Sequence, residues 1–170
     1  MRVEDFEEIA LPHLQDLLRT ATRILGNRTE AEDVVQDTYL QGWKSIHRFT
    51  PGTNIRAWLY TILFHLISNR RRKWFQYDFR LTDMDEAQLE ATLHYEAPVT
   101  QQLTDKDMLN ALDKLPTGFK AVLMLAVVEE FSYKETAEIL QLPIGTVMSR
   151  LHRGRKLLAH ELRNYSLPSH

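Results

Sequence analysis

Residues 144–158, with the sequence IGTVMSRLHRGRKLL, carry side chains suited to nucleic-acid chemistry. On a helix, one face of this stretch would present hydroxyl and guanidinium groups from Thr146, Ser149, Arg150 and Arg153. Arginine can bond the edge of guanine through two hydrogen bonds in the major groove, and hydroxyl or basic groups suit phosphates. Lys156 lies farther along, where we expect a phosphate contact. The alternative is a solvated amphipathic helix, because helix pairs of this length are common in bundles.

Two carboxylates and an amide form a second candidate group. Asp33, Gln36 and Asp37 are spaced by three and four residues, so a helix places them on one face. Adjacent carboxylates can perform acid–base chemistry, but this stretch offers no nucleophile and no clear set of metal ligands. The sequence has no Cys and no HExxH motif, and His152 and His160 are too far apart to ligate a metal from adjacent turns. We therefore expect no enzyme and no cofactor, and interpret the carboxylates as a patch that docks on a basic partner.

Aromatic and basic side chains lie close together in residues 56–74, RAWLYTILFHLISNRRRKW. Trp58 and Tyr60 precede a basic run from Arg70 to Lys73. Aromatic rings beside a basic cluster can stack bases and follow the phosphates of a single strand. The alternative is packing in the core, the commoner role of aromatics at helical spacing, and we expect the Trp58 ring to be at least partly buried.

Helices must position all of these groups, because apolar residues recur at helical spacing and no stretch reads convincingly as a strand. Helices are predicted over residues 14–26, 29–46, 55–77, 107–115, 118–131, 133–140 and 143–158. The last two, joined by a tight break, form the arrangement of a helix-turn-helix. The fold class is therefore predicted to be all-α, with two small helical domains.

Local signals predict where several of these helices begin and end. Gly26 is a stop signal for the first helix. Thr29 with Glu32 fits a capping box at the start of the second, and Ser132 with Glu135 fits one at the start of residues 133–140.

Charge divides the chain into three parts although its net charge is only -2. Residues 1–80 and 111–170 are each mildly basic, whereas residues 81–110 are strongly acidic. We interpret residues 81–104 as an acidic linker between two domains; the alternative is an acidic surface helix. The N-terminal stretch lacks the apolar core of a signal peptide. The longest apolar run, residues 121–128, is too short for a membrane span, so a cytoplasmic location without membrane insertion is expected.

Four stretches in order give the sequence a specific resemblance: GNRTEAEDVVQDTYLQGW, FTPGTNIRAWLYTIL, SNRRRK and LPTGFKAVLMLAVVEEFSYKETAEILQLPIGTVMSRLHRGRKLL. Together they resemble the extracytoplasmic-function (ECF) sigma factors of bacterial RNA polymerase. These motifs are most similar to those of the subgroup that responds to redox or envelope stress under zinc-binding anti-sigma factors. The resemblance covers residues 5–163.

The resemblance implies a transcription factor that binds core polymerase, recognises promoters and starts stress-responsive transcription. It implies a sigma-two-like domain over residues 1–80 and a sigma-four-like helix-turn-helix domain over residues 105–165. The partners would be core polymerase, through its β′ coiled coil and β flap, promoter DNA, and an anti-sigma factor, which binds zinc in this subgroup. The alternative is a sigma-like decoy that sequesters an anti-sigma factor without reading promoters.

The resemblance also assigns residues to these contacts. Polymerase would be met by Asp33, Gln36 and Asp37. The −10 element would be met by Thr53, Asn54, Arg56, Trp58, Asn69 and Arg72. The −35 element would be met by Thr146, Ser149, Arg150, Arg153 and Lys156. His65 departs from the family pattern, because many relatives have Asn there, and this bears on the preference for −10 sequences.

Overall fold

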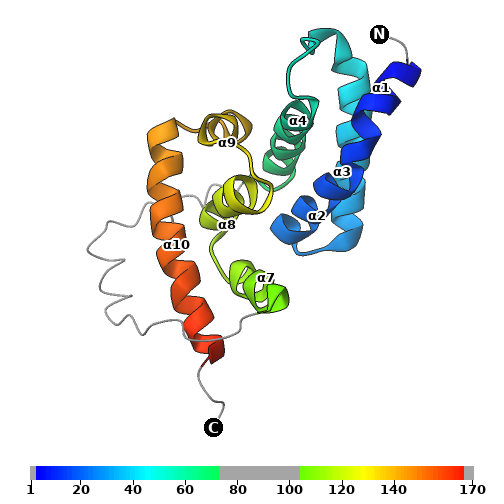
Figure 1. Ribbon diagram of the computed structural model, residues 1–170. Coiled ribbons are helices and arrows are strands. Elements are labelled where there is room, and N and C mark those ends of the chain that lie inside the picture. The colour runs from blue at the N-terminus through cyan, green and yellow to red at the C-terminus, as the bar shows by residue number, and fades with distance from the viewer. Residues whose placement is uncertain (1–2, 73–103, 167–170) are drawn as a thin grey trace.

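The computed structural model describes residues 3–72 and 104–166, and within these ranges the chain forms helices and turns without a strand (Figure 1). The first lobe consists of α1 (Val3–Ala10), the 3-10 turn η1 (Leu11–His13), α2 (Leu14–Leu25), α3 (Arg28–Ser45), the 3-10 turn η2 (Ile46–Arg48) and α4 (Ile55–Arg70). The second lobe consists of α7 (Asp105–Asp113), α8 (Thr117–Leu123), the π-helical turn η3 (Met124–Val128), α9 (Tyr133–Leu140) and α10 (Ile144–Ser166). The all-α prediction with two helical units is confirmed.

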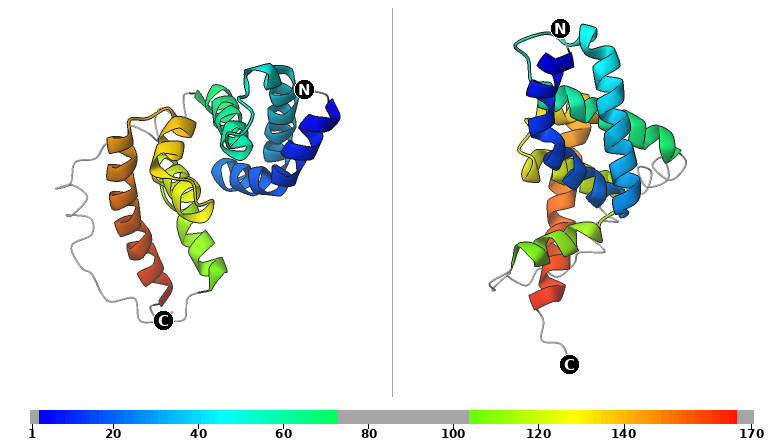
Figure 2. Two further views of the ribbon diagram at one scale, coloured as in Figure 1. Left: turned by 45° about the horizontal axis from the view of Figure 1, so that its top comes forward. Right: turned by 90° about the vertical axis from the view of Figure 1, so that its right-hand side faces the viewer.

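The two lobes lie side by side (Figure 2), and α9 of the second lobe packs against α4 of the first. The predicted linker lies outside the described residues except for Thr104, whose side chain caps α7 by accepting a hydrogen bond from the backbone of Asp107. The helix predicted over residues 55–77 is shorter than expected, because α4 ends at Arg70; residues 73–77 lie outside the described ones. Among the helices described, none is both long and apolar enough to span a membrane.

Apolar side chains at helical spacing form the core of the first lobe. Leu17 of α2, Val34 of α3 and Leu63 of α4 are completely buried. The close packing of α3 depends on Gly42, because a Cβ atom there would stand only 3.3 Å from the ring of Phe6. That separation is tighter than ordinary van der Waals contact, so a larger residue would push α1 away from α3.

The junction between α2 and α3 is built from two residues with non-helical backbone. Gly26 ends α2 with a φ of 68°, in the left-handed region that favours glycine. Asn27 is extended, and its side chain accepts a hydrogen bond from the backbone N–H of Glu30. The capping box predicted at Thr29 is therefore wrong. Thr29 already lies within the helix, where its hydroxyl cannot take the capping position.

The second lobe packs α10 against α8 and α9. Val147 and Leu151 of α10 are 0% and 2% exposed, so the apolar face predicted for this helix is confirmed. The capping box at the start of α9 is also confirmed, with Ser132 and Glu135 each bonding the backbone of the other. The resulting pair of α9 and α10 has the helix–turn–helix order predicted from the sequence.

Candidate nucleic-acid interface

The start of α4 gathers four of the six residues assigned to the −10 element. Asn54 caps the helix, since its side-chain oxygen accepts a hydrogen bond from the Ala57 backbone N–H at 3.2 Å. Thr53 and Asn54 are exposed. Trp58, one turn later, is partly buried as expected, and its ring lies 5.5 Å from that of Phe49, centre to centre. Exposed polar groups therefore stand beside a partly buried aromatic ring.

Arg56, the fourth residue of this group, points toward the second lobe. Its Nη2 atom lies 2.5 Å from a carboxylate oxygen of Glu129, and its Nε donates to Asp16 at 3.1 Å. The guanidinium carbon lies over the ring of Phe131 at 4.4 Å from its centre, and 5.1 Å from the ring centre of Tyr60. Arg56 therefore contacts residues of both lobes.

Tyr60 does not offer the stacking surface considered for it from the sequence. It is completely buried, and its hydroxyl lies 3.0 Å from that of Thr20. Burial raises the pKa of the phenol. The packing alternative for this aromatic is confirmed.

The remaining two −10 candidates lie at the opposite end of α4. Asn69 follows Asn54 by 15 residues, a separation of about 22 Å along the helix axis. The Asn69 side chain contacts His65, with 3.3 Å between its amide nitrogen and the ring Nε2. Arg72 is exposed just beyond the helix. The six candidates thus form two groups joined by one helix.

Two members of the basic run are held by carboxylates within the first lobe. Arg70 donates to Asp37 at 2.5 Å, and Arg71 pairs with Glu30. The hydrogen bond from Arg71 holds the pKa of the Glu30 carboxyl below its usual value. Lys73 lies outside the described residues. Within the described part of the run, these pairs fix the C-terminal end of α4 against α3.

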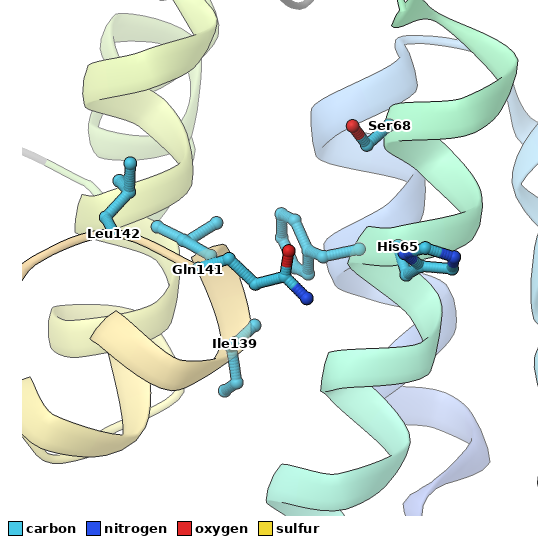
Figure 3. A pocket seen from close by; sticks show the side chains of 7 residues that line it. His65, Ser68, Ile139, Gln141 and Leu142 are labelled. Carbon is cyan, nitrogen blue, oxygen red and sulfur yellow. The ribbon is translucent and has the colours of Figure 1, made fainter.

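A pocket separates the middle of α4 from the turn between α9 and α10 (Figure 3). Phe64 and Ser68 line it from α4, and Ile139, Gln141 and Leu142 line it from the second lobe, with the Gln141 amide extending toward α4. A second cavity of about 310 Å³ lies between the start of α4 and α9. The −10 candidates at the start of α4 therefore face the second lobe.

The acidic patch lies on the outward face of α3. Asp33 and Gln36 are exposed, as the docking interpretation expects. Asp37 lies on the same face, but it is engaged by Arg70 in a half-exposed ion pair. The structure therefore brings the three candidates together, with one of them already paired.

Two large apolar residues extend this face, and the sequence interpretation did not include them. Leu40 is 50% exposed and Trp43 is 44% exposed. Leu40 follows Asp33 by seven residues and Asp37 by three, so helical spacing alone could have added it to the patch. Exposed leucine and tryptophan beside carboxylates are typical of a protein-docking surface.

The five −35 candidates on α10 differ in accessibility. Ser149 is exposed, whereas Thr146, Arg153 and Lys156 are half-buried. Among the other exposed residues of this helix, the sequence interpretation missed Met148, His152 and Arg155. Their spacing with Ser149 marks the side of α10 that faces outward.

Arg150 corrects the sequence interpretation of that face. It was placed with Ser149 on an exposed surface, but it is only 5% exposed. It follows the buried Val147 by three residues and precedes the buried Leu151, so helical spacing turns it inward. The charge of the arginine suggests an exposed position, but its place in the helix puts it on the packed face of α10.

The comparisons with known proteins agree with this arrangement. Residues 9–74 match the family described as Sigma-70 region 2, and residues 105–158 match Sigma-70, region 4. The ECF RNA polymerase sigma factor SigW of Bacillus subtilis is 31% identical over 94% of this chain and 89% of its own length. SigE of Mycolicibacterium smegmatis is 32% identical over 95% of this chain, which spans 63% of that relative.

Two solved structures share the fold. RpoE of Bartonella quintana, solved in complex with the anti-sigma factor NepR, superposes with a TM-score of 0.71 at 28% identity, over 95% of this chain and 98% of that one. CnrH, solved with the cytosolic domain of CnrY, gives 0.64 at 26% identity, over 96% and 90%. With both sigma-70 regions matched in order, the chain belongs to the ECF sigma factors, non-enzymatic proteins that initiate transcription with RNA polymerase.

Proposed function

We propose that the two lobes divide promoter recognition as the family assignment suggests. The first lobe, within residues 1–80, docks on core polymerase and reads the −10 element; the second, within residues 105–165, reads the −35 element. The observation that carries the proposal is the grouping of Thr53, Asn54 and Trp58 at the start of α4, on a different lobe from the outward face of α10. The acidic residues 81–104 connect the lobes.

The first lobe meets polymerase through the outward face of α3. Asp33, Gln36 and Asp37 supply charge and hydrogen bonding for a basic partner such as the β′ coiled coil, and Leu40 supplies exposed apolar surface. The β flap is the contact we propose for the second lobe. Both partners would place the protein in the cytoplasm, where polymerase works.

The −10 element is read from α4. Thr53, Asn54 and Trp58 contact the flipped base and the strand near it, with Arg56 beside them. Asn69 and Arg72 hold the strand farther along the same helix. His65 lies between these two groups, so it is the residue through which the −10 preference of this chain would differ from that of relatives with Asn.

The −35 element is read from α10. Ser149 is already exposed, and Thr146, Arg153 and Lys156 flank it with partial exposure. Hydroxyl groups and Lys156 suit phosphates, and Arg153 suits a base edge or a phosphate. A base contact from Arg150 requires its side chain to leave the buried position that it holds in this structure.

We propose further that an anti-sigma factor regulates the chain. The relative RpoE was solved with the anti-sigma factor NepR, and CnrH with the cytosolic domain of CnrY. This chain has two small lobes whose polymerase and DNA surfaces a single partner could cover. Redox or envelope stress as the signal, and zinc in the partner, follow from the sequence resemblance. The product of a neighbouring gene, prepared with zinc and after chelation, tests the regulation and the zinc: it should block transcription, and chelation should relieve the block.

Run-off transcription with purified core polymerase tests the proposed function directly. Adding the chain should give initiation at defined promoters of host DNA, and scrambling the −10 or the −35 element should reduce it. The decoy alternative predicts the opposite result: no promoter-specific transcript, together with tight binding of an anti-sigma factor. A chain that binds core polymerase but ignores both elements would contradict the division of labour between the lobes.

A further inference from the structure

The segment after α8 lies beside the first lobe (Figure 1), and its Glu129 carboxylate pairs with Arg19 and Arg56 of that lobe. The π-helical turn η3 ends at Val128, and Glu130 has a φ of 60°, in the left-handed region. The Glu129 side chain is 1% exposed, whereas Glu130 is exposed. Glu129 is therefore buried at a point where the helix is interrupted and the backbone is strained.

Groups of the first lobe surround this carboxylate. Arg19 donates through Nη2 to Oε2 at 2.7 Å and through Nε to Oε1 at 3.0 Å. Arg56 donates through Nη2 to Oε2 at 2.5 Å, and the Thr20 hydroxyl donates to Oε1 at 3.1 Å. Two guanidinium groups and a hydroxyl converge on one anion, which is the arrangement of an oxyanion-binding site.

The first lobe itself supplies part of what holds this site in shape. Asp16 bonds Arg19 and Arg56, each at 3.1 Å. Arg56 lies 5.1 Å from the ring centre of the buried Tyr60. Without Glu129, the two arginines and Asp16 would leave one net positive charge, with Asp16 still bonding both arginines. The site would then attract another anion.

Carboxylates of the second lobe engage two residues proposed to meet the −10 strand. Arg56 binds Glu129, and Asn54 donates to Glu135 at 2.8 Å. Asn54 and Arg56 are two residues apart at the start of α4, so a strand that reaches Asn54 passes close to the site. A phosphodiester group presents two non-bridging oxygens and one negative charge, as a carboxylate does.

We propose that the site formed by Arg19, Thr20 and Arg56 binds a backbone phosphate of the melted promoter strand, and that Glu129 fills it while the lobes are closed. The inference rests on the proposed −10 function and adds a regulation of it. The phosphate and the Glu129 carboxylate compete for the same donors. Strand binding then requires the lobes to separate, and the apparent affinity falls with the fraction of open protein.

Three variants of the full chain test two claims separately: that Glu129 holds the lobes together, and that the site binds a phosphate. Glu129→Gln removes the negative charge of the side chain that fills the site. Glu130→Gln is the matched control, with the same change one residue away on an exposed side chain. Arg19→Gln breaks the same contact from the other side, and Arg19 is half exposed, so folding should tolerate it. Circular dichroism should show native helicity for each.

Lobe separation is measured by energy transfer between dyes. The sequence has no Cys, so Thr29→Cys and Lys106→Cys give one labelling pair at exposed positions of the two lobes. Glu129→Gln and Arg19→Gln should both change the transfer, and Glu130→Gln should not. Unchanged transfer in both of the first two variants would show that this contact does not hold the lobes together.

Affinity for a short single-stranded DNA of random sequence, without polymerase, tests the phosphate site. Glu129→Gln should bind roughly tenfold more tightly than the native chain, because one charge-assisted contact no longer competes. Arg19→Gln should open equally but gain little affinity, with a salt dependence shallower by about 0.7 in the log–log slope than that of Glu129→Gln. Equal gains for both variants would overturn the phosphate site. These readouts need no promoter, so failure of the −10 assignment would appear separately, in run-off transcription.

Discussion

Arg150 and Arg155 offer a matched test of how α10 is oriented. Both are arginines on one helix, five residues apart, but Arg150 is 5% exposed and Arg155 is exposed. Truncation of a buried arginine removes both its polar contacts and the packing of its aliphatic stem. We therefore expect Arg150→Ala to lower the free energy of unfolding by about 1–3 kcal/mol. For a chain of this length that corresponds to a fall of roughly 2–12 °C in Tm.

Arg155→Ala should change the free energy of unfolding by less than about 0.5 kcal/mol, as exposed positions usually do. Its effect should appear instead in initiation, because a basic group on the outward face of α10 can contact DNA. Thermal melts give the first quantity. Run-off transcription on a host promoter, with intact and scrambled −35 elements, gives the second.

We expect opposite patterns for the two variants. Arg150→Ala should lose stability but keep its preference for the intact −35 element when transcription is measured below the Tm of the variant. Arg155→Ala should keep stability and lose activity. If Arg150→Ala melts like the native chain and loses the −35 preference, Arg150 faces DNA as its residue type suggested, and the inward orientation is wrong.

Three further predictions concern the first lobe and the lobe contact. Asp37→Arg should weaken binding to core polymerase with native helicity retained, and unchanged affinity in a titration would remove Asp37 from the docking surface. Hydrogen bonding from the Ser132 backbone holds the Glu135 carboxyl pKa below its ordinary value of 4.5. This contribution to stability is present above pH 4.5 and is lost as pH falls through the lower folded pKa. Glu135→Gln should therefore make the free energy of unfolding less dependent on pH on the acid side. The same pH dependence in the variant and the native chain would contradict this. Gly42→Ala should cost about 1–3 kcal/mol, since its Cβ would stand 3.3 Å from the Phe6 ring, and an unchanged urea midpoint would show that α1 yields freely.

The sequence predicted what depends on neighbours along the chain. The apolar face with Val147 and Leu151, the capping box at Ser132 and the stop at Gly26 all arise from residues within one or two turns, so periodicity and capping preferences report them. The shift of the α3 cap from Thr29 to Asn27 is an error of two residues, decided by backbone conformation at the junction. Such ends are the least specified part of a helix pattern.

Contacts between distant parts of the chain left no comparable signal. Arg19 and Glu129 are separated by 110 residues, and the sequence around each gives no sign of the other. A carboxylate after an apolar run reads as the solvated end of a helix, and only the approach of the first lobe makes it a buried group. The same limitation explains Arg150, whose residue type favours solvent while the packing of α8 and α9 around α10 decides its surroundings.

The separation of Arg19 from Glu129 also sets an order of events during synthesis. The first lobe is complete once α4 ends at Arg70, 59 residues before Glu129, and at typical elongation rates these residues take roughly 3–12 s. Throughout that interval the nascent first lobe presents its two arginines without the carboxylate that later covers them. A partner that recognises this lobe alone could therefore capture the chain before its second half exists.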